Sequence, residues 1–162
     1  MTSTIHAARV RSIGWRCASC GELITDIEVG WVEWLAGADE YGTTRLKGLR
    51  LVHNLCRYDD RREFRKDQSL VEGLPLARFV GPDGLMLLLS LIAEGEMPRT
   101  ELIELVKRLH IPGYELTREL FADAIHGGAV APLVGEGFYM QSEIREVLTW
   151  AVKAVGPPEQ SL

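Results

Sequence analysis

The chain is poor in cysteine and has no long apolar run. Its 162 residues include three cysteines, and so small and odd a number argues against a disulfide framework and for reduced thiols. The longest apolar run, residues 85–93, is too short to cross a bilayer. The first ten residues lack the basic-then-apolar pattern of a secretory leader. We therefore expect a cytoplasmic protein with no membrane association.

Positive charge is also scarce. The formal net charge is −5, with 11 basic and 10 acidic residues in 1–70 but 6 basic and 11 acidic residues in 81–154. No segment has the high density of positive charge that is typical of proteins that bind nucleic-acid phosphates.

Catalytic motifs are also absent from the sequence: it contains no phosphate-binding loop, no serine-hydrolase elbow and no metalloprotease helix motif. The sequence therefore predicts a protein that is not an enzyme.

The three cysteines fall into two short motifs with a histidine. Cys17-Ala-Ser-Cys20 and His53-Asn-Leu-Cys56 each place two ligand-type side chains three positions apart. A turn of this length can curl around one tetrahedral ion, and two such turns supply its four ligands. Three thiolates and one imidazole fill the coordination of zinc and leave no open position. We expect Cys17, Cys20, His53 and Cys56 to hold one structural zinc ion.

The segment between the two motifs is predicted to form a β-hairpin. Alternating apolar residues indicate strands at 23–35 and 46–53, separated by a turn-rich stretch at 37–42. A hairpin would return His53 to the same end as Cys20. Residues 8–57 thus resemble the zinc-ribbon class, in which a metal closes the open end of an antiparallel ribbon. The second motif departs from that pattern, because it has a histidine in place of a cysteine and no glycine after Cys56.

Beyond residue 67 the apolar period changes to that of helices. Helices are predicted at 84–93, 98–109, 116–126 and 142–153, with a glycine-tipped β-hairpin at 129–140. This order of elements resembles a winged helix-turn-helix domain over 82–154. The expected fold class is therefore α+β, with a zinc-stapled ribbon at 1–68, a connector at 69–81, the winged-helix-like domain at 82–154 and a disordered tail at 155–162.

The winged-helix resemblance implies a reading helix, but that helix is acidic here. In DNA-reading winged helices the third helix enters the major groove with basic or amide side chains. Its predicted exposed residues in this chain include Glu115, Arg118 and Glu119, and the wing tip offers Glu136. These carboxylates would be repelled by phosphate. A protein-docking use of the fold suits this surface better.

Two functions follow from these patterns. The favoured one is a non-enzymatic, zinc-stabilised adaptor or regulatory subunit that docks a protein partner, in a complex that handles nucleic acid. Its docking residues would be Trp31, Trp34 and Tyr41 on the hairpin and Glu115, Arg118 and Glu119 on the third helix. The alternative is a small DNA-binding transcriptional regulator whose zinc half contacts phosphate through Arg9, Arg11, Arg45, Lys47 and Arg50.

Overall fold

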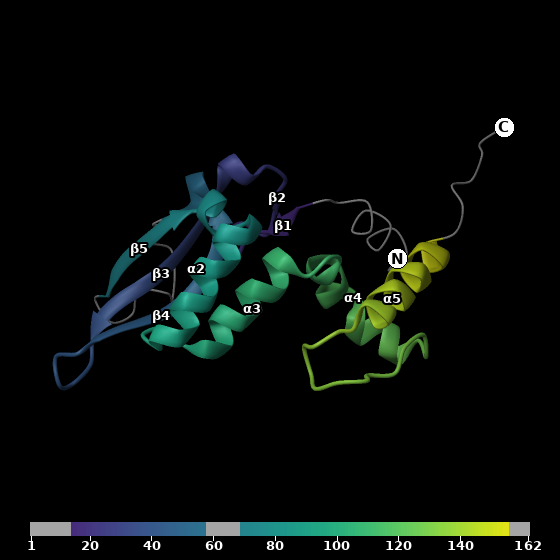
Figure 1. Ribbon diagram of the computed structural model, residues 1–162. Coiled ribbons are helices and arrows are strands. Elements are labelled where there is room, and N and C mark those ends of the chain that lie inside the picture. Colours follow the sequence, from purple (N-terminus) through teal and green to yellow (C-terminus); the bar gives the residue numbers. More distant parts are fainter. Residues whose placement is uncertain (1–13, 58–68, 156–162) are drawn as a thin grey trace. The chain divides into compact units, whose positions relative to one another are not determined.

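The computed structural model describes residues 14–57 and 69–155. It divides into two compact units, residues 14–111 and the part that begins at Pro112 (Figure 1). The fold is α+β, with antiparallel sheets first and helices after them. None of the helices in these two stretches has the length and apolar character needed to cross a bilayer. Arg9, Arg11 and, apart from Val155, the tail predicted at 155–162 lie outside the described residues.

The unit of residues 14–111 begins with a short β-hairpin. Strand β1 (Trp15–Arg16) pairs with β2 (Leu23–Ile24) in antiparallel fashion. The first metal motif forms the turn between them. A 3₁₀ helix, η1 (Ile27–Val29), follows and is capped by the Asp26 carboxylate, which accepts from the Glu28 N–H at 2.9 Å.

The predicted main hairpin is confirmed. Strand β3 (Gly30–Ala38) pairs with β4 (Thr44–His53), so that Gly30 lies opposite His53 at the open end. Strand β5 (Leu70–Pro75) joins the other side of β3 and completes a sheet of order β4-β3-β5. A β-bulge shifts the register opposite Glu33–Leu35, where Gly48 on β4 has φ +69°. Simple alternation therefore fails across Gly48. Leu51 and Val52, beyond the bulge, face opposite sides of the sheet and are both fully buried, so both faces of β4 are covered there.

Two helices complete this unit. Helix α2 (Gly81–Glu94) lies against the sheet in Figure 1 and helix α3 (Arg99–His110) lies beside α2, and the 3₁₀ helix η4 (Leu76–Phe79) leads into them. Leu88 of α2 and Leu102 of α3 are fully buried in one core with Val32 and Leu51 of the sheet. This shared core is why the compact units divide between Ile111 and Pro112.

The predicted domain boundary lay elsewhere, at a connector spanning 69–81. That stretch instead forms β5 and η4. The apolar faces of α2 and α3 need a surface to bury against, and the sheet supplies it. Period analysis detects that a helix has an apolar face but does not say which partner covers it.

Gly84 permits the close approach of α2 to η4. A Cβ at this position would lie 2.1 Å from the carbonyl carbon of Phe79. We predict that Gly84→Ala destabilises this unit by about 1–3 kcal/mol, because helix and 3₁₀ turn must separate to admit the methyl group. Urea unfolding followed by tryptophan fluorescence measures the loss. Gly135→Ala is the matched control, since its Cβ would meet nothing within 4 Å. Equal stability of the two variants would contradict the close approach.

The second unit contains helix α4 (Tyr114–His126) and helix α5 (Gln141–Val155). They enclose a small core of buried apolar residues comprising Leu120, Phe121, Ala124, Val130, Val147 and Ala151. Tyr139 stacks on Phe121 with ring centroids 3.9 Å apart. All four predicted helices, α2 to α5, are thus confirmed within a few residues at each end.

The β-hairpin predicted at 129–140 is wrong. This stretch contains no strand and forms a loop. Buried Glu143 holds the loop, because its carboxylate accepts from the N–H of Leu133 at 2.9 Å and of Met140 at 2.6 Å. Side-chain bonds satisfy the backbone that a strand ladder would otherwise pair. Without a wing, the winged-helix resemblance depends on helix order alone.

Candidate metal centre

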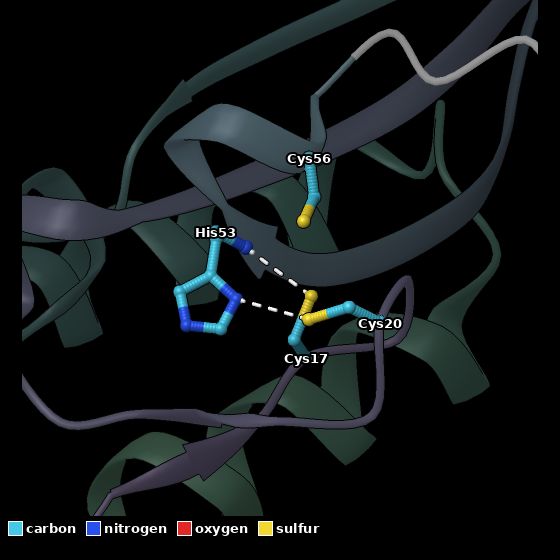
Figure 2. A group of neighbouring side chains, drawn as sticks. All are labelled: Cys17, Cys20, His53 and Cys56. Carbon is cyan, nitrogen blue, oxygen red and sulfur yellow. Dashed lines mark hydrogen bonds between the residues drawn. The ribbon is translucent and has the colours of Figure 1, made fainter.

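The four predicted ligands come together at the open end of the β3–β4 hairpin. Each of Cys17, Cys20, His53 and Cys56 offers one donor atom, and all four atoms lie within 4.8 Å of one another. Figure 2 shows the three sulfur atoms and the imidazole turned toward one small space. The cysteines form no disulfide. This grouping is what the spacing of the two motifs predicts.

The first half-site is a tight turn between β1 and β2. Cys17 is buried, and its sulfur accepts from the backbone N–H of Ser19 at 3.3 Å. The Gly21 N–H closes the turn by donating to the Cys17 carbonyl at 3.0 Å. Gly21 has φ +78°, which a residue with a side chain rarely adopts. The turn is anchored to the main hairpin because the Ala18 N–H donates to the Leu51 carbonyl at 2.8 Å.

The second half-site begins where β4 ends. His53 is the last residue of β4, and Cys56 closes the 3₁₀ helix η2 (Asn54–Cys56). The His53 backbone N–H donates to the Cys17 sulfur at 3.3 Å, which joins the two half-sites directly. The imidazole Nδ1 lies 3.4 Å from the Cys20 sulfur. The strand end and the short helix therefore deliver two donors to the first turn.

The ring of His53 is oriented by a backbone group. Its Nε2 lies 3.1 Å from the Leu23 carbonyl oxygen of β2. A carbonyl only accepts, so Nε2 carries the proton and donates, and Nδ1 keeps its lone pair for the cluster. Metal-bound histidines typically hold their second ring nitrogen in this way. The arrangement fixes the tautomer that can bind a cation.

The spacing of the donors fits a tetrahedral ion. Metal–sulfur bonds of about 2.3 Å place two thiolates roughly 3.8 Å apart around a tetrahedral centre. The donors here lie within 4.8 Å of one another, so only small side-chain rotations are needed to reach that geometry. The group of four can hold a metal ion.

The local environment separates the acidities of two of the thiols. Burial alone would raise the pKa of Cys17, but N–H groups of Cys20, His53 and Ser19 donate to its sulfur and lower the pKa to about 7. The pKa of Cys56 is raised to about 11, by burial first and also by the neighbouring thiols Cys17 and Cys20. A divalent cation would remove this repulsion between thiolates. The cluster is thus a place where positive charge is stabilising.

Neither the protein-family models, nor the curated proteins, nor the solved structures contain a match to this chain. Any function must therefore be inferred from the side chains themselves, above all from the four-donor cluster.

The two arginines next to the half-sites have partners of their own. Arg16 donates from Nη1 to the Gly21 carbonyl at 2.9 Å and so braces the first turn. The Arg57 guanidinium lies over the Trp31 ring, 4.7 Å from its centroid. Both arginines contribute to the shape of the site through these contacts.

The residues predicted to dock a partner differ in their exposure. Tyr41, in the turn between β3 and β4, is 84% exposed. Trp31 and Trp34 are half-buried against the core, and the Trp34 indole donates to the Glu72 carboxylate at 3.3 Å. In the second unit Glu115 and Arg118 form an ion pair of 3.1 Å, and both are half-buried, as is Glu119. Only Tyr41 of these six presents a largely free surface.

The described residues that were predicted to contact phosphate also differ in their exposure to solvent. Arg45 and Lys47 are exposed, and their partners on β3 place them on the same sheet face. Arg45 pairs with the Asp39 carboxylate at 3.2 Å. Arg50 instead turns to Glu33, which is fully buried, and pairs with it across the strands. Arg50 is therefore a structural residue of the sheet.

The role of Glu33 was not predicted from the sequence. The carboxylate stands out because it interrupts the apolar face of a predicted strand. A buried carboxylate needs a cationic partner, and Arg50 is the cross-strand neighbour of Glu33 in the observed register. The signal was present in the sequence, but the bulge at Gly48 had to be known to identify the partner.

Proposed function

We propose that this chain is a non-enzymatic, zinc-stabilised adaptor or regulatory subunit that docks a protein partner within a complex that handles nucleic acid. The observation that carries the proposal is a group of four donor side chains, which would fill the coordination of one tetrahedral ion: Cys17, Cys20, His53 and Cys56. The His53 ring is already oriented by the Leu23 carbonyl. Such a site organises a binding surface and does not itself react.

Zinc is the ion that this donor set favours. Three thiolates and an imidazole are soft and borderline ligands, and a tetrahedral site of sulfur and nitrogen is typical of zinc. Calcium and magnesium require oxygen ligands, which this cluster does not supply. Reduced thiols in place of disulfides are consistent with the cytoplasmic compartment.

Catalysis at this centre is not proposed, because hydrolytic zinc needs an open position and a general base. Four protein ligands fill the tetrahedral coordination. The imidazole of His110 on α3 contacts the Phe79 carbonyl through Nε2 at 2.8 Å. It serves to join α3 to η4.

A DNA-binding regulator is the second candidate, supported by the shared exposed face of Arg45 and Lys47. The net charge of −5 opposes it. Two exposed cations supply little of the phosphate neutralisation that non-specific binding requires. Protein docking is therefore favoured.

A mobility-shift titration separates these two functions. With a labelled duplex at about 50 mM and about 200 mM salt, we expect no shift at micromolar protein. An adaptor should instead retain a defined protein when the tagged full-length chain is used as bait in extracts of its native host. Tight DNA binding that weakens steeply with salt, and that Arg45→Ala reduces, would establish the regulator and overturn the adaptor.

A further inference from the structure

At one edge of the main sheet, no described residue forms a further strand. Strand β5 pairs with β3 on one side only. Within the described residues no strand lies on the other side of β5, and the Glu72 side chain accepts a hydrogen bond from the Trp34 indole of β3. In an antiparallel edge strand, alternate residues direct both backbone groups away from the sheet. Among residues 14–57 and 69–155, no strand pairs with the backbone donors and acceptors on the outer side of β5.

The opposite edge of the sheet is closed by other groups. On β4 the Leu51 carbonyl accepts from the Ala18 N–H at 2.8 Å. The Leu49 N–H donates to the Glu101 carboxylate of α3 at 2.7 Å. These contacts occupy backbone groups that a neighbouring strand would need. A strand added beside β4 could therefore not pair with its residues 49–51.

The side chains of β5 give this edge a specific chemistry. Leu70 and Leu74 are 66% and 36% exposed, and Glu72 between them is exposed as well. Because side chains alternate along a strand, these three share one face of the sheet. A strand added beside β5 would place its own side chains next to them. The complementary pattern is apolar, basic, apolar at alternate positions.

We propose that the outer edge of β5 binds an extended segment of a partner protein, which adds to the sheet as a further strand with a Lys or Arg beside Glu72 and apolar side chains beside Leu70 and Leu74. Main-chain hydrogen bonds supply the affinity of such strand addition, and the alternate side chains supply its selectivity. The inference depends on the proposed docking function and names the chemistry of the partner.

A second copy of this chain fits the edge less well. Antiparallel pairing of two β5 strands that sets Leu70 against Leu74 of the other copy also sets Glu72 directly opposite Glu72. Like charges at facing positions destabilise a strand pair. Glu72 thus selects a basic partner and opposes self-association.

Peptide binding to the full-length protein tests this edge. The probe is a fluorescein-labelled peptide containing Val-Thr-Lys-Thr-Val, followed by anisotropy, with a Val-Thr-Glu-Thr-Val peptide and a backbone N-methylated lysine peptide for comparison. We expect the lysine peptide to bind about five- to tenfold more tightly than the glutamate peptide, from the change of one cross-strand charge pair. N-methylation should abolish binding, and hydrogen exchange in residues 70–75 should slow on binding.

Charge reversal at the edge supplies the sharper readout. Glu72→Lys should invert the preference between the two peptides, whereas Glu40→Lys, in the exposed turn between β3 and β4, should leave it unchanged. Absence of binding, equal binding of both peptides, or binding that survives N-methylation would overturn the proposal. Pull-down with full-length protein carrying either the native Glu72 or Glu72→Lys distinguishes failure of the β5-edge proposal from failure of the docking function. Identical retained partners would defeat the edge and leave the docking function intact, and a bait that retains no protein would defeat the docking function itself.

Discussion

Cys20→Ser should release the metal and destabilise residues 14–111 by about 3 kcal/mol or more, since a structural zinc ion contributes on the order of 10 kcal/mol to the folding of small zinc domains. Cys20 is the most informative ligand to change because it is exposed. A serine there costs little packing, unlike a serine in place of buried Cys17. The loss of stability then reports the loss of the ion.

Two measurements on purified protein check this expectation. Elemental analysis should find one zinc per wild-type chain and much less in Cys20→Ser, and a chelator should lower the unfolding temperature of the wild type alone. Asn54→Ala is the matched control, because Asn54 is exposed and lies inside the second half-site without being a ligand. Wild-type protein that is folded and free of metal would defeat the structural role of the centre.

Arg50→Ala should destabilise the same unit by about 3–5 kcal/mol, because it leaves the Glu33 carboxylate buried without its cross-strand cation. Glu33 is fully buried and the Arg50 side chain is only 11% exposed, so solvent screens the pair little. Denaturant unfolding monitored by tryptophan fluorescence measures the effect, which should appear as a lower midpoint.

The neighbouring arginine provides the control for this change. Arg45, with a side chain 65% exposed, also pairs with a carboxylate, and its replacement by alanine should leave stability nearly unchanged. The double variant Glu33→Leu with Arg50→Met should recover most of the loss, because apolar residues can replace a buried ion pair. An Arg50→Ala protein as stable as Arg45→Ala would show that the pair does not support the sheet.

The cluster of four donor side chains was the most predictable part of this chain. Its signal is local, since the Cys17–Cys20 and His53–Cys56 spacings and Gly21 each describe a single turn. The hairpin between them was also predictable, because a ligand set must converge and 32 intervening residues need a structure that returns on itself. The donor atoms converge as expected. The carbonyl of Leu23 that orients His53 could not be predicted, since it depends on where β2 lies.

Other elements were mispredicted because their patterns are locally ambiguous. Residues 129–140 combine apolar runs with a glycine turn, as a hairpin does, yet the Glu143 carboxylate binds the backbone that strands would have paired. Residues 69–81 carry Pro75 and few periodic positions, and they became β5 and η4 because β3 had a free side to pair with. In both cases a group outside the segment decided the outcome.

The sequence by itself determined the ligands, the two turns that carry them, the ribbon between them and the four helices from α2 to α5, because each depends on neighbours within a few residues along the chain. Only the tertiary structure decided that α2 and α3 share the core of the sheet, that Arg50 neutralises Glu33, and that no described residue forms a further strand beside β5. Those outcomes depend on which apolar faces and backbone groups find partners far away in the sequence. The bulge at Gly48 shifts the pairing of β3 with β4 by one residue, so the cross-strand partners cannot be counted from the turn alone.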